Sequence, residues 1–176
     1  MKLEWRDVSI GDGPAISTSL TLDETAELQR LAKGAEVLEI GSAYGYSTVA
    51  LASVADLVVA VDPHQALRSL EALRANLGLY GVRQRVDIRV GRSQDFLPGM
   101  VKGSRRFDLV WIDGDHEAIG VAYDLTWSLQ LLRPTGTLAV HDYGEDTCPD
   151  VRLALDAWKV PPRLVDTLAV YGPGEW

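Results

Sequence analysis

From residue 35 onwards, short apolar runs rich in Val, Ile and Leu alternate with longer stretches of helical periodicity. Such runs are typical of strands that are buried on both faces. The pattern predicts strands near residues 36–40, 57–62, 86–90, 107–112 and 136–141, and helices near residues 46–54, 65–79, 117–132 and 149–159. Because the two kinds of element alternate, we expect an α/β fold with a Rossmann-like, doubly wound, mostly parallel sheet and helices on both faces.

The two ends of the chain depart from this alternation. Residues 1–20 show no sustained periodicity, so we interpret them as an arm or loop that could cover a pocket. The spacing of Thr21 and Glu24 is that of a capping box, which predicts a helix within residues 21–34 that Gly34 can end. Residues 163–172 have strand character without room for another helix, which indicates a short antiparallel strand or a tight antiparallel pair.

One segment, Val37 to Thr48, changes from an apolar run to glycines and then to a helical pattern, which predicts strand, tight turn and helix. Gly41 and Gly45 permit positive φ angles and a close approach of a ligand to the backbone. The free N–H groups at the start of the following helix would face that ligand. The segment therefore predicts a pocket for a nucleotide-like cofactor.

The same turn does not match the dinucleotide pattern G-x-G-x-x-G. Ala43 and Tyr46 occupy the second and third glycine positions of that pattern, so a pyrophosphate would fit poorly. Glu39, at the end of the strand, also opposes an anion and suits an ammonium or sulfonium group better.

Polar groups follow the end of every predicted strand, and the carboxyl ends of parallel strands meet at one edge of a sheet. We therefore expect these groups to surround one ligand site. In chain order they are Glu39 with Gly41, Asp62, the segment 91–95, the segment 113–116, and the segment 141–143.

Three of these positions suit a nucleoside. Asp62 lies 21 residues beyond Gly41, where a carboxylate can accept both hydrogen bonds of a ribose diol; its alternative role is a loop acid or helix cap before Pro63. Ser93 and Gln94 could receive an adenine, although Ser93 could equally cap the next helix.

A second group of polar residues suits a cation or an acid–base reaction. Asp113, His141 and Asp142 follow neighbouring strands and could converge on a divalent cation; the alternative roles of the acids are helix capping and turn formation. His116 could act as a general base, with an ordinary surface histidine as the alternative. His64 is interpreted as a turn residue near the cofactor.

Composition excludes several classes of protein. The 176 residues, 47% of them hydrophobic, fit a single globular domain, with an arm over 1–20, a helix over 21–34 and a core over 35–176. The net charge of −8 disfavours nucleic acid and anionic membranes as partners. Without a signal-like N-terminus or an apolar run of about 18 residues, we expect a cytoplasmic protein. Cys148 is the only cysteine, so no internal disulfide can form.

Taken in order, three parts of the chain resemble the class I S-adenosylmethionine (SAM)-dependent methyltransferases, and within them the small-molecule O-methyltransferases of the catechol O-methyltransferase-like and bacterial natural-product group. The parts are Glu39–Ser47, Gly91–Pro98, and Asp108–His116 followed by Thr137–Tyr143. The resemblance implies a seven-stranded sheet whose last strand is antiparallel, and methyl transfer from SAM to a hydroxyl group of a small molecule.

The resemblance also implies roles for individual residues. His116, His141 and Asp113 would be catalytic, and a divalent metal such as Mg or Mn would bind to Asp113, His141 and Asp142, although His141 stands where metal-dependent members usually have an acid. A short N-terminal region makes a homo-oligomer plausible, with a neighbouring subunit completing the pocket. The implied SAM site comprises Glu39, Gly41, Ser42, Ala43, Gly45, Tyr46, Ser47, Asp62, Pro63, His64, Ser93, Gln94 and Asp113.

Two other functions stay open at this point. A nicotinamide-dependent oxidoreductase could use a similar sheet, although glycines are missing at residues 43 and 46. A non-catalytic protein could keep the cofactor pocket as a relic, although the intact set of polar groups at the strand ends disfavours that function.

Overall fold

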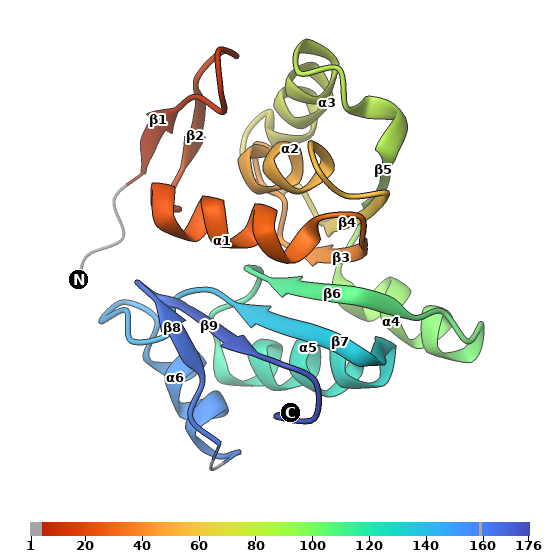
Figure 1. The fold of residues 1–176 in the computed structure, drawn as a ribbon, viewed down its shortest axis with the longest axis vertical. Coiled ribbons are helices and arrows are strands. Elements are labelled where there is room, and N and C mark those ends of the chain that lie inside the picture. The colour runs from red at the N-terminus through yellow and green to blue at the C-terminus, as the bar shows by residue number, and fades with distance from the viewer. Residues whose placement is uncertain (1–4, 159) are drawn as a thin grey trace.

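The computed structural model describes residues 5–158 and 160–176, and Figure 1 shows its fold. Residues 1–4 of the expected arm and residue 159 of the predicted last helix lie outside the described residues. The elements in chain order are β1 (Arg6–Val8), β2 (Ile16–Thr18), α1 (Leu22–Ala32), β3 (Glu36–Ile40), α2 (Tyr46–Ala52), β4 (Leu57–Asp62), α3 (Ser69–Leu79), the 3-10 turn η1 (Arg83–Arg85), β5 (Val86–Val90), α4 (Ser93–Lys102), β6 (Phe107–Ile112), α5 (Ala118–Leu131), β7 (Leu132–Val140), α6 (Pro149–Asp156), β8 (Arg163–Val165) and β9 (Leu168–Tyr171).

The main sheet has seven strands in the order β5-β4-β3-β6-β7-β9-β8. The five strands from β3 to β7 pair in parallel, which confirms the predicted doubly wound sheet. β9 pairs antiparallel with both β7 and β8, so residues 163–172 form the tight antiparallel pair that was one of the two expectations. The strand order changes direction at β3, with β4 and β5 on one side of it and β6 and β7 on the other, which opens a crevice at the carboxyl ends of these strands.

Helices cover both faces of the sheet because the central strands are apolar on both sides. In β3, Val37 packs with α1, α2 and α3 in one core, while its neighbour Leu38 packs with α4, α5 and α6 in the other. Successive side chains of a strand point to opposite faces, so a run without polar interruptions serves both cores. Trp111 in β6 is fully buried on the first face, as its position inside a strand predicts.

The N-terminal region differs from its prediction. Instead of an arm or loop, β1 and β2 form an antiparallel hairpin separate from the main sheet. Each strand pairs over three residues only, which is too short for alternation to be recognised in the sequence. Tyr80 at the end of α3 holds the hairpin, because its hydroxyl donates to Pro14 O and accepts from Ile10 N at 3.1 Å.

Two helices start where local chemistry places them. The capping box before α1 is confirmed: Thr21 Oγ1 accepts from Glu24 N at 3.1 Å, and the Glu24 carboxylate accepts from Thr21 N at 2.8 Å. α3 begins at Ser69, four residues later than predicted, because Arg68 has a φ of +59°. Among the described residues, no helix combines the length and the apolar character that crossing a bilayer requires.

Candidate cofactor and acceptor site

A cavity of about 590 Å³ lies at the carboxyl ends of β3, β4, β5 and β6, where the polar groups of the sequence were expected to meet. The loops after these strands form its floor, and the N-terminal hairpin contributes Trp5 and residues 17–20 to its wall. Trp5 also contacts Tyr44 edge to face, with 5.9 Å between ring centroids. The cavity is therefore enclosed by segments far apart in the sequence.

The turn after β3 follows the backbone of the neighbouring strand closely. Gly41 has a φ of +91°, and a Cβ atom there would lie 2.0 Å from the carbonyl oxygen of Asp113. Gly45 also has a φ of +91°, and a Cβ atom there would lie 2.6 Å from Leu73 Cδ1. At both positions the positive φ and the lack of space for a Cβ atom require glycine. Of the two, Gly41 lines the cavity and Gly45 does not. The free N–H groups at the start of α2 face this turn.

Asp62, at the end of β4, organises the same turn. Its Oδ2 atom accepts from the backbone N–H groups of Ser42 and Ala43, each at 2.9 Å, and Oδ1 accepts from His64 N at 2.5 Å. The carboxylate lines the cavity. An ionised carboxylate has about four acceptor positions, so capacity is left for a ligand hydroxyl.

Glu39 lies beneath the turn and not in the cavity wall. Its side chain is fully buried, and Ser47 Oγ donates to its Oε1 at 2.5 Å. The Oε2 atom has no hydrogen-bond partner among the described residues. Burial, reinforced by the charges of Asp113 and Asp62, raises the pKa of Glu39 to about 8. Glu39 is thus a buried carboxyl group that a nearby positive charge would ionise.

Beyond β5, α4 directs Ser93 and Gln94 into the cavity. Ser93 is the first residue of α4 and not its cap; the cap position belongs to Arg92, whose N–H donates to Asp95 Oδ2 at 2.9 Å. Asp124, from α5, also lines this part of the cavity, and burial raises its pKa to about 6. Its position inside a helix gave no sequence signal for a role in the site.

Asp113, His141 and Asp142 converge, as predicted. His141 Nδ1 lies 3.3 Å from Asp113 Oδ1 and 3.1 Å from Asp142 Oδ1, and both His141 and Asp142 are buried. Neither His141 Nδ1 nor Asp142 Oδ1 has a hydrogen-bond partner of good geometry among the described residues. Asp113 and Asp142 line the cavity, whereas His141 lies behind them.

His116, in the loop after β6, is a partly exposed cavity residue that pairs with the second oxygen of Asp142. The distance from His116 Nε2 to Asp142 Oδ2 is 2.7 Å. The hydrogen bond to Asp142 raises the pKa of His116. Cys148 is buried, and its Sγ atom lies within 4.8 Å of these ligand atoms of His116 and Asp142. Tyr143 lies outside the cavity lining, and its hydroxyl donates to Asp156 at 2.7 Å.

The predicted site residues therefore divide into two sets. His64 belongs to those outside the lining, because its Nδ1 atom lies 3.1 Å from Ser69 Oγ and its backbone N–H is bound by Asp62. Residues missed by the sequence analysis include Gln65 and Ala66, beside Pro63. The predicted residues that line the cavity are Gly41, Ser42, Ala43, Tyr46, Ser47, Asp62, Pro63, Ser93, Gln94, Asp113, His116 and Asp142; those that do not are Glu39, Gly45, His64 and His141.

Comparison with known proteins agrees with this arrangement. A family model described as a methyltransferase domain matches residues 38–143, which is more than half of the chain and includes the turn after β3 and the ends of β6 and β7. The chain belongs to this methyltransferase family. The matched segment contains the polar groups at the strand ends, whereas Trp5 and residues 17–20 of the cavity wall lie outside it.

A named relative is similar in sequence to this methyltransferase. A protein from Mycobacterium tuberculosis (strain ATCC 25618 / H37Rv) named catechol O-methyltransferase is 35% identical over an alignment of 152 residues, and the match covers 74% of this chain and 66% of that protein. This methyltransferase thus spans just under two thirds of the relative's length.

Among solved structures, the O-methyltransferase TomG from Streptomyces achromogenes, involved in tomaymycin synthesis and solved in complex with SAM, is 27% identical, with a TM-score of 0.67 over 80% of this chain and 69% of that one. Cofactor-bound Rv0187 from MTB is 28% identical, with a TM-score of 0.73 over 92% of this chain and 84% of that one.

Proposed function

We propose that this methyltransferase transfers the methyl group of SAM to a hydroxyl group of a small molecule. The observation that carries the proposal is that two chemically different sets of residues face one cavity. Gly41, Asp62 and Gln94 form one set, and Asp113 and His116 form the other. The first set suits a nucleoside with a cationic sulfur, and the second suits a hydroxyl group that must lose a proton.

Binding of SAM is proposed to use the strand-end groups in chain order. The turn from Gly41 to Ser47 would receive the methionine portion, Asp62 the ribose diol, and Ser93 with Gln94 the adenine. The acidic character of the lining favours a cationic ligand, and the buried carboxyl group of Glu39 would add a negative charge beneath the sulfonium once ionised. The SAM-bound TomG structure supports the choice of cofactor.

The residues of the other set are proposed to orient and deprotonate the acceptor. His116 would accept the hydroxyl proton at Nδ1, the ring nitrogen that does not contact Asp142, since its partner Asp142 makes the imidazole a stronger base. The walls formed by Trp5 and Tyr44 would exclude water and hold the acceptor oxygen about 3 Å from the methyl carbon. When bound, SAM supplies an electrophilic methyl group: the S–CH₃ bond breaks, the O–CH₃ bond forms, and the sulfur keeps the electron pair.

A divalent cation is proposed to bind Asp113, His141 and Asp142. His141 Nδ1 and Asp142 Oδ1 are buried, lie 3.1 Å apart and have no hydrogen-bond partner among the described residues, which supports this fit because such groups are costly to leave unsatisfied. Two carboxylates and an imidazole suit Mn²⁺, Fe²⁺ or Zn²⁺ as well as Mg²⁺. When bound, the cation would lower the pKa of the acceptor hydroxyl group.

The remaining expectations stay predictions. They are the division of the chain at residues 20 and 34, a homo-oligomeric state, a cytoplasmic location, and the lack of nucleic-acid and membrane partners. The acceptor is proposed only as a hydroxylated small molecule, which the catechol O-methyltransferase relative supports.

Methyl transfer is tested with radiolabelled SAM and a panel of hydroxylated acceptors, including catechols. We expect label in the acceptor and equimolar S-adenosylhomocysteine (SAH). Chelation with EDTA should abolish transfer, and Mg²⁺ or Mn²⁺ added alone should restore it; full activity in chelator would contradict the cation site. A matched pair of variants, His116→Gln and His64→Gln, separates the proposed base from a histidine outside the cavity. We expect kcat to fall in His116→Gln and to stay at the wild-type value in His64→Gln.

A further inference from the structure

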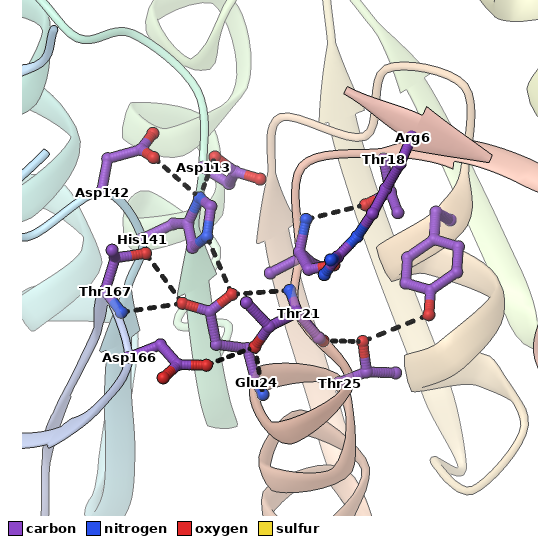
Figure 2. Close-up of polar contacts among 12 residues, drawn as sticks. Arg6, Thr18, Thr21, Glu24, Thr25, Asp113, His141, Asp142, Asp166 and Thr167 are labelled. Carbon is purple, nitrogen blue, oxygen red and sulfur yellow. Dashed lines mark hydrogen bonds and ion pairs between the residues drawn. The ribbon is translucent and has the colours of Figure 1, made fainter. Parts of the chain in front are cut away.

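Glu24 is a buried carboxylate whose contacts exceed those of an ordinary helix cap. It lies in the first turn of α1, is 1% exposed and is absent from the cavity lining. A capping box requires only its contact with Thr21 N. In Figure 2 the same carboxylate also reaches Thr167 and His141. Oε1 accepts from Thr167 N at 2.9 Å and from Thr167 Oγ1 at 2.7 Å, while Oε2 lies 3.4 Å from His141 Nε2.

These contacts determine how the His141 ring is oriented. The imidazole stands between two acidic environments, with Nε2 towards Glu24 and Nδ1 towards Asp113 and Asp142, as Figure 2 shows. When Nε2–H donates to Glu24, the neutral ring carries its lone pair on Nδ1. Among the residues that the structure describes, that atom has no hydrogen-bond partner of good geometry, and it lies 3.1 Å from Oδ1 of Asp142, which has none either.

We propose that Glu24 is the positioning residue of the cation site, holding the Nε2 proton of His141 so that Nδ1 is presented as a ligand beside Asp113 and Asp142. This proposal rests on the proposed function, and it concerns a residue outside the cavity. Histidine ligands of metals generally donate their second N–H group to a carboxylate or carbonyl, and loss of that partner weakens metal affinity about 10–100-fold.

The same carboxylate joins three parts of the fold. It belongs to α1, its partner His141 directly follows β7, and Thr167 occupies the turn between β8 and β9. Thr167 O also accepts from Tyr143 N at 2.9 Å, next to Asp142. The position of the ligand nitrogen is therefore fixed from both the N-terminal helix and the C-terminal strand pair, before any ligand enters the cavity.

Glu24→Gln tests the proposal, because glutamine keeps the size of the side chain but cannot accept at both of its terminal atoms. The Kd of Mn²⁺ is measured by electron paramagnetic resonance titration, and the tautomer of His141 by long-range ¹H–¹⁵N spectra of the diamagnetic protein. We expect the Kd of Mn²⁺ to rise about 10–100-fold and the share of Nε2–H tautomer to fall. SAH affinity, measured by calorimetry, should be retained, because Glu24 does not line the cavity.

Thr167→Val is the matched control, since it removes a donor to Oε1 of the same carboxylate and leaves the His141 contact in place. If Glu24 acts on the cation only through general stability, both variants should weaken Mn²⁺ binding in proportion to their loss of stability in urea, and the proposal is overturned. It is also overturned if folded Glu24→Gln binds Mn²⁺ as the wild type does. If the wild-type protein binds SAH but not Mn²⁺, this inference alone is rejected, and a proton rather than a cation bridges His141 and the carboxylates of Asp113 and Asp142. A wild type that binds neither rejects the proposed function too.

Discussion

Gly41→Ala should damage the site, because the turn after β3 has no space for an added methyl group. The added Cβ would lie 2.0 Å from Asp113 O, 2.5 Å from Asp113 C and 2.9 Å from Gly114 Cα. All three are backbone atoms, and they belong to a segment fixed by the hydrogen bond from Asp113 N to Ile40 O at 2.8 Å. Relief therefore requires β3 and β6 to separate where both strands enter the cavity.

The expected magnitude follows from two contributions. An L-residue at a positive φ costs about 1–2 kcal/mol, and overpacking against a rigid neighbour costs a further ~1–3 kcal/mol. Gly34→Ala provides the control, because Gly34 also has a positive φ, of +67°, but a Cβ there meets no atom of the described residues within 4 Å. Gly34→Ala should thus lose only the first contribution, about 1–2 kcal/mol.

Urea unfolding and SAH calorimetry on both variants separate these contributions. We expect Gly41→Ala to be the less stable variant by the overpacking contribution and to lose SAH affinity, while Gly34→Ala binds SAH as the wild type does. Equal stability of the two variants, or unchanged SAH binding by Gly41→Ala, would refute the close approach of the two strands.

Three further predictions concern the buried acid, the hairpin and the helix cap. The pKa of Glu39 is raised to about 8, so between the ordinary value of 4.5 and 8 the folded protein keeps a proton that the unfolded chain loses. The free energy of unfolding should therefore fall as pH rises through this range. Urea unfolding at several pH values should show a weaker pH dependence for Glu39→Gln than for the wild type, and an equal pH dependence of the two proteins would contradict this. Tyr80→Phe removes the hydroxyl that holds the hairpin, so hydrogen exchange over residues 6–18 should accelerate and the acceptor KM should rise at unchanged kcat. Thr21→Ala should lower the free energy of unfolding by about 1 kcal/mol, which thermal or urea unfolding checks, and an unchanged midpoint would exclude the capping box.

The sequence was sufficient for four parallel strands of the main sheet, whereas β7 begins at Leu132, four residues before the predicted strand of 136–141. β3, β4, β5 and β6 have the bounds that the apolar runs predicted, and the polar groups after them meet at one edge because parallel strands share that edge. The capping box before α1 was equally readable, since both partners lie within four residues of each other. These are features of local sequence or of strand order.

What the sequence could not supply depends on contacts between distant segments. The hairpin is attached to α3 by hydrogen bonds of Tyr80 to residues 66 and 70 positions away in the sequence. Asp124 lines the cavity from within α5. In the sequence, an acidic residue inside a helix is indistinguishable from an ordinary solvent-facing one. His64 had the expected place in the chain, but a positive φ of +51° and its contact with Ser69 turn its side chain away from the cavity.

The central claim is that one edge of the sheet binds a cationic or thioether nucleoside rather than a dinucleotide. Titrating SAH and NAD separately into the same protein by calorimetry tests it most directly, with Asp62→Asn as the variant. We predict saturable SAH binding at one site per chain, a weaker SAH isotherm for Asp62→Asn, and no heat from NAD. Binding of NAD without binding of SAH would contradict the account.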